Sequence, residues 1–456
     1  MSAPSPQIPP TDSATEGRPT GSKRRRALLG SVGLAVGLGL MAQTCGEPVQ
    51  QPLAAFHQVD MGRYCPQSKR PAQRPELALA VAISGGGHRA GNFGMGALLG
   101  LEDKGLLQEV DYISTVSGGG WAAGGYVAAL HDHLDAGGTH QDFSLQAVFD
   151  REGDHSLRRS MERGYKGEIA SALLNPWVIL TDVNRGDALE EAIDGWLLGQ
   201  ERRGRSLVLG DVFQAAGQCQ PQAMVPYWIT NSAVVTNGAI FPFTPAALER
   251  YSIHGAVHHM ETLRFDDPYR APVAVGVKAS AAFPGGVPPT TLHSALTHDD
   301  QPLFIHLTDG GVVDNLGLDT ALDMLEADTA KRKVLIVVDA FKDHSHPMST
   351  ATTPPSALST AARTTTLAMD SDRLYARKRL SRMAKAMHIE VVYIDLDTLS
   401  QANPDSASVR ARTAAARQIS TDFNLTPEEQ TTLVGLGKDA VTKVSTPLLD
   451  QLLVNP

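Results

Sequence analysis

Residues 77–89 read Leu-Ala-Leu-Ala-Val-Ala-Ile-Ser-Gly-Gly-Gly-His-Arg, an unbroken apolar run followed directly by a glycine turn. Because polar and apolar residues do not alternate in the run, it predicts a strand that is covered on both faces, as in a parallel sheet. Residues 93–107 then carry apolar side chains at helical spacing. The segment therefore predicts an α/β fold, with an anion-binding backbone at the corner between strand and helix.

A second strand and helix follow at once. Residues 112–116 form a short apolar run that ends at Ser117, and residues 118–130 predict an Ala-rich helix. Glycines after the serine permit a sharp turn, and the helix N-terminus supplies N–H groups and the positive end of a dipole. The usual nucleophile pattern is Gly-x-Ser-x-Gly, but Thr115 occupies the first glycine position. Taken alone, this segment also fits a flexible loop or a helix cap.

Strand and helix patterns keep alternating toward the C-terminus, which predicts a mainly parallel sheet in three layers. The later predicted strands are residues 304–307, 334–338 and 389–394, with helices at 316–326 and within 409–454. Residues 131–270 are more polar, and we predict insertions and cap elements there, with a strand near 227–235. Residues 343–366 are rich in Ser, Thr, Ala and Pro and predict a mobile surface loop.

The N-terminal part of the chain has the composition of an export leader. The 456-residue chain has a net charge of −9, yet its first 46 residues carry five basic and two acidic side chains. Four basic residues at 23–26 precede the uncharged apolar run 27–42, which predicts a signal peptide or a membrane anchor. We therefore expect a protein that is exported or membrane-tethered in a bacterium. The expected organisation is a leader at 1–46, a linker at 47–75 and one catalytic domain at 76–456.

The three cysteines are Cys45, Cys65 and Cys219. No two of them have the spacing of metal ligands, so the sequence predicts no metal site, and it predicts no nucleic-acid partner, because the body is acidic. In an exported protein Cys65 and Cys219 could pair, but two free buried thiols agree equally well with the sequence.

A third segment, Leu307-Thr308-Asp309-Gly310-Gly311, places a carboxylate at the end of a predicted strand. Ligands of open α/β sheets bind at the carboxyl ends of strands, so Asp309 is a candidate catalytic base. Asp314, Asp339 and Asp395 have similar positions. The glycine pair favours Asp309, because it lets the chain turn sharply toward another loop.

The glycine turn and the acidic residue could also belong to two other kinds of site, a nucleotide-binding loop or a Ser-His-Asp triad. A dinucleotide loop would need an acidic residue at the end of a second strand, and a Walker loop would need Gly-Lys-Ser/Thr; neither follows Gly85–Gly87. A Ser-His-Asp triad would need a histidine downstream of the acid at the junction of a strand and a loop. His344 and His346 lie in polar segments, and His388, just before a predicted strand, keeps that possibility open.

Taken together, the motifs resemble those of the patatin-like phospholipases, with some similarity to the cytosolic phospholipase A2 branch. The motifs are Ile83 to Arg89, Val116 to Gly119 and Asp309-Gly310-Gly311, with looser matches at 226–231, 279–284, 309–315 and 423–425. The resemblance spans roughly residues 77–450 and implies a three-layer α/β/α patatin-like fold with a mainly parallel central sheet. It departs from the family pattern at Thr115 and at Gly310-Gly311, where many members have Gly-Ala.

By position in these motifs, the resemblance implies a Ser-Asp dyad without histidine, in which Ser117 is the nucleophile and Asp309 is the general base. The backbone of Gly85, Gly86 and Gly87, with Gly118, would bind the oxyanion, and Arg89 would orient this turn or meet a substrate phosphate. The expected activity is that of a lipid acyl hydrolase of the phospholipase A type, acting through an acyl-serine intermediate without a cofactor.

The expected partners are a phospholipid or another acyl-lipid substrate and a membrane surface. Two alternatives stay open at this point: a lipid transacylase or thioesterase, and a non-enzymatic lipid-binding scaffold on the same fold. The sequence leaves the oligomeric state undetermined.

Overall fold

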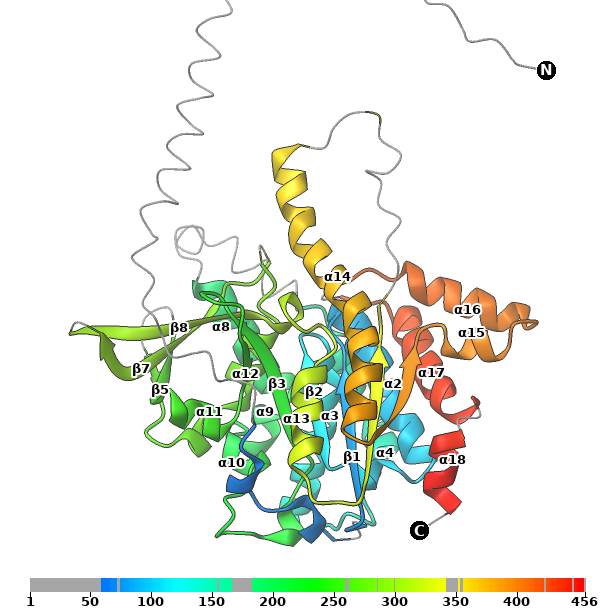
Figure 1. Cartoon of the computed structure of the whole chain (residues 1–456), viewed down its shortest axis with the longest axis horizontal. Coiled ribbons are helices and arrows are strands. Elements are labelled where there is room, and N and C mark those ends of the chain that lie inside the picture. The colour runs from blue at the N-terminus through cyan, green and yellow to red at the C-terminus, as the bar shows by residue number, and fades with distance from the viewer. Residues whose placement is uncertain are drawn as a thin grey trace, which may run out of the picture. The chain divides into compact units, whose positions relative to one another are not determined.

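A ten-stranded mixed sheet lies at the centre of the protein, in the order β10-β9-β1-β2-β3-β8-β7-β5-β6, with β4 paired to β3 (Figure 1). The computed structural model describes residues 59–71, 74–153, 156–165, 183–258, 262–284, 286–298, 300–341, 352, 356–421, 424–444 and 447–454. The strands are β1 Leu77–Ile83, β2 Tyr112–Val116, β3 Tyr227–Val234, β4 Ile240–Pro242, β5 Ile253–Val257, β6 Thr262–Arg264, β7 Thr290–His298, β8 Gln301–Asp309, β9 Arg332–Asp339 and β10 Ile389–Asp395.

Five strands, from β10 to β3, run parallel. Every residue of β1, β2 and β3 is buried, and for β1 this is what the apolar run 77–83 predicted. Ile83 pairs with Thr115 and Val116 pairs with Asn231, so β1 and β2 end at the same edge of the sheet. The glycine turn and Ser117 therefore meet at that edge.

The other half of the sheet is antiparallel, so the parallel part that the alternating pattern predicted forms the centre of a mixed sheet. The strand β8 is antiparallel to β3 and pairs only with its last three residues, from Leu307–Val234 to Asp309–Ser232. Because β8 stops there, its last residue lies level with the carboxyl ends of the parallel strands. Asp309 thus reaches the predicted edge, although its strand runs in the opposite direction.

Helices cover both faces of the sheet, which confirms the predicted three-layer α/β/α fold. On one face α13 packs on β1, β2 and β9 and touches α14, while α2, α3, α12 and α17 belong to the other layer (Figure 1). The main helices are α2 Gly87–Asp103, α3 Gly119–Asp135, α12 Val273–Ser280, α13 Leu318–Ala327, α14 Ala357–Ala386, α16 Ala407–Gln418 and α17 Pro427–Thr442. The shorter helices are α4 Leu145–Phe149, α5 Leu157–Glu162, α8 Val183–Ala192, α9 Gln200–Arg203, α10 Leu209–Val212, α11 Pro245–Arg250, α15 Thr398–Ala402 and α18 Pro447–Val454.

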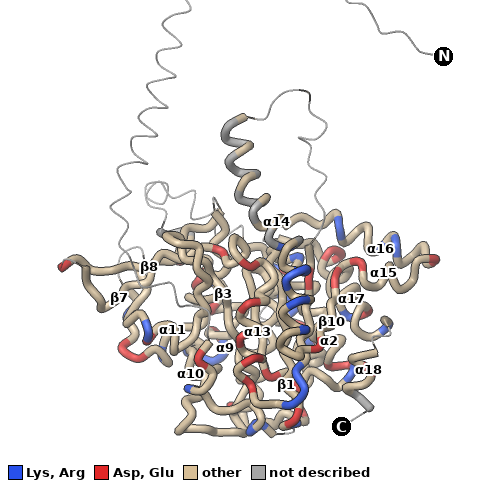
Figure 2. The backbone as a smooth tube through the Cα atoms, viewed as in Figure 1, with Lys and Arg blue, Asp and Glu red and all other residues tan. Residues whose placement is uncertain are grey.

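The two neighbouring helices α13 and α14 carry opposite charges (Figure 2). Basic residues lie along α14 and acidic residues along α13, and Arg379 donates to Asp319 across the contact at 2.7 Å. Near its middle α14 passes the edge that carries the glycine turn, because Met369 lies against Gly311. The helix therefore borders the edge at which Ser117 and Asp309 lie.

Three predicted boundaries need correction. Residues 357–366 are the first turns of α14 rather than part of a mobile loop. The interval 131–270 is not only peripheral, because it supplies β3, which lies between β2 and β8. Part of the predicted linker 47–75 belongs to the body, where Tyr64 forms a bridge with Ala215 and both Tyr64 and Cys65 are buried.

Cys65 and Cys219 form a disulfide, so the pairing that the sequence left open is present. It joins the segment before β1 to the segment before β3. The predicted leader, including residues 27–42, lies outside the described residues. Among the helices that the structure does describe, none combines the length and the apolar character needed to cross a membrane.

Candidate active site

Ser117 lies at a sharp corner between β2 and α3. Its φ of +50° is in the left-handed region, which residues other than glycine adopt only where their surroundings hold them there. Its backbone N–H donates to Ser280 Oγ at 2.8 Å, and that hydroxyl donates to the Asn231 carbonyl at 2.6 Å. The corner is therefore held from α12 and β3, and it has the strand-to-helix geometry of a nucleophile elbow.

Gly118 lets this corner approach the glycine turn closely. A Cβ at position 118 would lie 1.9 Å from the Gly87 carbonyl oxygen, and a Cβ on Gly119 would lie 2.5 Å from the carbonyl oxygen of Ile83. Both distances are far below van der Waals contact, so only glycine fits at either position. The two loops of the predicted site therefore pack backbone against backbone.

The N-termini of α2 and α3 meet at this contact. Gly86 and Gly87 have φ values of +141° and +60°, and α2 begins at Gly87. The Gly85 N–H donates to the Asn315 carbonyl at 2.9 Å, whereas the N–H groups of Gly86, Gly87 and Gly118 have no acceptor among the described residues. Three N–H donors with the positive ends of two helix dipoles can stabilise an oxyanion beside Ser117.

Asp309 faces Ser117 from the end of β8 and is only 1% exposed. Burial raises the pKa of its carboxyl to about 6, while hydrogen bonds from the Ser117 hydroxyl and the Gly311 N–H act in the opposite direction. The Gly311 N–H lies 2.8 Å from Asp309 Oδ1. An ionised carboxylate whose pKa is close to neutrality is a better proton acceptor than an ordinary aspartate.

The other aspartates considered from the sequence are engaged elsewhere. Asp314 accepts the N–H groups of Leu316 and of Asp319, the second residue of α13. Asp339 accepts from Arg373 at 2.7 Å and from the Tyr393 hydroxyl. Asp395 accepts the Thr398 hydroxyl and the Asp397 N–H. Of the four candidates, Asp309 is the one that faces Ser117.

No histidine is among the hydrogen-bond partners that the structure describes for Asp309, which are Ser117 and Gly311. His88 Nε2 lies 3.1 Å from the Arg163 carbonyl, and His306 Nδ1 lies 2.9 Å from the Thr291 hydroxyl. His388 has a φ of +55° in the turn just before β10. A Ser-Asp pair is therefore the arrangement that the described residues form.

Arg89 is buried below the glycine turn. Its guanidinium donates to the carbonyl oxygens of Ala340 and Ile419 and to the Thr421 hydroxyl, at 2.8, 3.2 and 2.8 Å. Burial lowers its pKa to about 10. These contacts correspond to the first role considered for Arg89, that of orienting the turn, and contact with a substrate phosphate stays a prediction.

Several supporting residues were not assigned a role from the sequence. Trp228 Nε1 donates to Thr115 Oγ1 at 2.8 Å, so the threonine that replaces the usual elbow glycine has a partner on β3. Asn231 donates to Ser114 Oγ and to the Thr115 carbonyl. Trp228, Asn231 and Ser280 lie in the looser sequence matches to the family, at 226–231 and 279–284. These matches are the feature of the sequence from which a supporting role could have been predicted.

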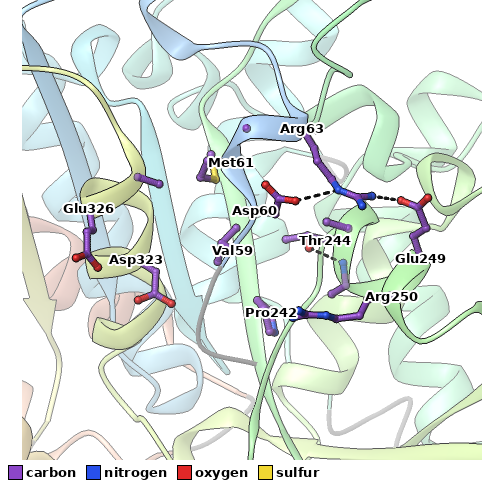
Figure 3. A pocket seen from close by; sticks show the side chains of 14 residues that line it. Val59, Asp60, Met61, Arg63, Pro242, Thr244, Glu249, Arg250, Asp323 and Glu326 are labelled. Carbon is purple, nitrogen blue, oxygen red and sulfur yellow. Dashed lines mark hydrogen bonds and ion pairs between the residues drawn. The ribbon is translucent and has the colours of Figure 1, made fainter. Parts of the chain in front are cut away.

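A pocket lined by several charged residues lies away from this edge. It has a volume of about 590 Å³, and Figure 3 shows charged side chains around it. Asp323 and Glu326 line it from the C-terminal half of α13, whereas Asp309 precedes the N-terminus of that helix. None of the site residues predicted from the sequence lines this pocket. Among the described residues, no group of three or more His, Cys, Asp or Glu is placed to hold a metal ion.

The fold and the three motifs agree with a comparison to known families. The family model described as patatin-like phospholipase matches residues 81–322, more than half of the chain. The chain therefore belongs to the patatin-like phospholipase family. No curated protein matches its sequence.

Solved structures with a similar chain trace include human GIVD cytosolic phospholipase A2, at 13% identity and a TM-score of 0.44, covering 83% of this chain and 60% of that one. Its complex with methyl gamma-linolenyl fluorophosphonate gives 14% identity, a TM-score of 0.42, and coverage of 83% and 58%. VipD from Legionella pneumophila gives 14% identity, a TM-score of 0.32, and coverage of 83% and 67%. The chain spans about 60% of the length of the human enzyme.

Proposed function

We propose that this protein is a lipid acyl hydrolase of the phospholipase A type, in which Ser117 and Asp309 form a catalytic dyad. The observation that carries the proposal is the pairing of a serine at a left-handed corner with a buried carboxylate whose pKa is raised to about 6. Membership of the patatin-like phospholipase family supports a lipid ester as the substrate.

In the acylation step, Ser117 Oγ attacks the ester carbonyl carbon and Asp309 takes the hydroxyl proton. The negative charge that develops on the carbonyl oxygen is stabilised by the N–H groups of Gly86, Gly87 and Gly118, where each such donor is commonly worth about 2.7–4 kcal/mol of the barrier. The ester C–O bond then breaks, and the proton on Asp309 passes to the leaving alkoxide. An acyl-serine remains.

Deacylation repeats these steps with water. Asp309 accepts a proton from the attacking water, a second tetrahedral intermediate forms on the same N–H donors, and the bond to Ser117 Oγ breaks. The proton returns from Asp309 to Ser117, and the fatty acid leaves. One carboxylate serves both steps, because its pKa of about 6 lets it bind and release a proton near neutral pH.

The proposal is tested with a fluorophosphonate probe and a p-nitrophenyl acyl ester. We expect the probe to label Ser117, as located by mapping the labelled peptide, and Ser117→Ala to lose both labelling and ester turnover while its unfolding temperature stays within a few degrees. Ser252→Ala is the matched control, because Ser252 has the same backbone conformation, with a φ of +49°, at a position outside the site. Turnover retained by Ser117→Ala would exclude Ser117 as the nucleophile.

We propose further that the protein acts outside the reducing cytosol, exported or held at a membrane. The Cys65–Cys219 disulfide supports this, since such bonds persist in oxidising compartments. The basic and apolar composition of residues 23–42 agrees with it. Fractionation of producing cells, with thiol labelling before and after reduction, should find the protein outside the cytosol with Cys65 and Cys219 blocked; a cytosolic protein with both thiols free would contradict the proposal.

A further inference from the structure

Asn315 connects the two loops of the site. Its backbone carbonyl accepts the Gly85 N–H at 2.9 Å, and it lies at the end of the turn that begins with Asp309. The residue is only 6% exposed. The mechanism derived above gives its side chain no role, although it belongs to one of the sequence matches with the family.

The Asn315 amide fills the space between the glycine turn and the Asp309 turn. A Cβ on Gly85 would lie 2.3 Å from Asn315 Oδ1 and 3.4 Å from the Cβ of Ser117. A Cβ on Gly311 would lie 2.5 Å from the same amide oxygen and 3.0 Å from Asp309 Oδ1. The amide oxygen and the carboxylate oxygen therefore both lie within 3.0 Å of one point.

The amide oxygen is buried and has no hydrogen-bond partner among the described residues. A buried polar atom without a partner is unfavourable, and here the nearby oxygen of Asp309 is also an acceptor and so cannot satisfy it. A half-turn about the Cβ–Cγ bond exchanges the amide oxygen and nitrogen. The exchange places the Nδ2 donor in the position near Asp309 that the amide oxygen now occupies. The two carboxylate oxygens of Asp309 can accept more bonds than those from Ser117 and Gly311.

We propose that Asn315 is a positioning residue of this active site, whose amide donates a hydrogen bond to Asp309 and holds the carboxylate toward Ser117. The proposal rests on the function proposed above for Ser117 and Asp309. A donor to the ionised form also favours that form, so the amide helps to keep Asp309 charged when substrate arrives.

Charged groups around the site do not offer the same contact. Asp314 is turned to the N-terminus of α13, and Arg89 is engaged by Ala340, Ile419 and Thr421. From α14, the side chain that contacts Gly311 is the apolar Met369. The described causes that set the pKa of Asp309 are burial, Ser117 and Gly311, with no charged neighbour among them.

The test compares Asn315→Leu with Asn315→Asp in the full chain, using the dependence of kcat on pH with a soluble p-nitrophenyl ester. Leucine keeps the size and the backbone bond to Gly85 but has no donor. We expect it to lower kcat about 10-fold to 100-fold with KM within twofold, and to move the acid limb of the profile upward by at least half a pH unit. Loss of a donor raises the pKa of the carboxyl, which gives this direction.

Asn315→Asp places a second carboxyl beside Asp309, and two such groups share one proton over part of the pH range. We expect partial rescue in that range, because the protonated carboxyl donates as the amide does, and a new loss of activity at higher pH where both carboxyls ionise. Asn92→Leu is the control, since Asn92 is a fully buried amide that donates to His88 and Met161 within the body. It should lower the unfolding temperature without moving the pH limb.

The proposal is overturned if folded Asn315→Leu keeps kcat within twofold and the acid limb in place. If Asn315→Leu does not fold, the Asn315→Asp profile decides: a new alkaline limb supports the proposal, and its absence overturns it. Failure of the dyad itself is recognised separately, because the unsubstituted protein would then neither turn over the ester nor react with the fluorophosphonate at Ser117.

Discussion

The site at the end of β2 and the pocket beside the C-terminal half of α13 differ in the burial and in the hydrogen-bond partners of their charged side chains. In the pocket, Arg63 is paired with Asp60 and Glu249, and these side chains are about half exposed or more. At the site, Asp309 is almost fully buried and has neutral hydrogen-bond donors in place of a cation. The pocket is richer in charge, whereas among the described residues the carboxylate that faces Ser117, the proposed nucleophile, lies at the site.

Both regions contain an aspartate with a raised pKa, and this makes the comparison informative. The pKa of Asp323 is raised to about 7 by partial burial and by the neighbouring carboxylates Asp319 and Glu326. The pKa of Asp309 is raised to about 6 by burial alone, against two hydrogen bonds that lower it. A raised pKa therefore identifies a candidate base only together with the groups that the carboxylate faces.

The largest effect is expected from Asp309→Asn. Removing a positioned general base slows turnover by about 10²–10⁴-fold, so we expect a loss of roughly 10³-fold in kcat for a p-nitrophenyl acyl ester. In the unsubstituted enzyme, kcat should fall as the pH drops through about 6, where Asp309 becomes protonated. Turnover by Asp309→Asn within tenfold of the unsubstituted enzyme would remove Asp309 from the mechanism.

The same substitution should stabilise the protein at alkaline pH. The folded state binds a proton at Asp309 more tightly than the unfolded state does, so stability is lost as the pH rises from about 4 through about 6. A pKa raised from 3.8 to about 6 corresponds to about 3 kcal/mol above pH 6. Asp309→Asn should therefore raise the unfolding temperature at pH 8 and raise it less at pH 5. A lower unfolding temperature at pH 8 would show that the buried, charged carboxylate of Asp309 does not destabilise the folded protein.

Gly118→Ala is expected to have the next largest effect. Its Cβ would lie 1.9 Å from the Gly87 carbonyl oxygen, so the elbow must move away from the glycine turn and its N–H donors. Loss of oxyanion stabilisation of this kind lowers kcat by about 10²–10³-fold. Gly217→Ala is the control, because nothing lies within 4 Å of the added carbon. Unchanged kcat in folded Gly118→Ala would show that this close approach is not required.

The elements of the site could be predicted because their sequences allow few other structures. The apolar run 77–83 is β1 to the residue, and 112–116 is β2. The direction of β8 could not be predicted, because its pairing with the last three residues of β3 is set by tertiary packing and not by its own residues. The start of α2 at Gly87 was missed as well, because glycines are poor helix formers and Gly87 has a left-handed φ of +60°.

The partners of Ser117 show the same limit. Positions 117 and 309 were predicted from motifs, but the bond from the Ser117 N–H to Ser280 joins residues 163 positions apart, and no local pattern encodes it. Trp228 donates a hydrogen bond to Thr115, and Asn231 donates one to Ser114. These bonds form because the pairing of β2 with β3 places the residues side by side. Such contacts require the register of strands, which the sequence of a single chain does not give.

Ser280→Ala should have a moderate effect. It removes the acceptor of the Ser117 N–H, and an unsatisfied buried N–H costs about 1–3 kcal/mol. If about 1 kcal/mol of this appears in the barrier, kcat falls roughly fivefold to tenfold with KM unchanged. Ser294→Ala is a suitable control, since Ser294 is an equally buried serine that donates to the Tyr251 carbonyl at 2.6 Å. Equal kcat values for the two variants would mean that Ser280 does not hold the elbow.

The smallest effect is expected from Asp323→Asn, which tests whether the aspartate with a raised pKa in the pocket contributes to ester turnover. Asp323 has a raised pKa but faces Asp319 and Glu326 instead of a nucleophile, so kcat should stay within twofold at every pH. Its raised pKa means that stability is lost as the pH rises through about 7, so the variant should gain stability at pH 8 and gain less at pH 5. A tenfold loss of ester turnover in folded Asp323→Asn would show that the pocket takes part in the reaction. The groups that an aspartate with a raised pKa faces would then not distinguish the active site from the pocket.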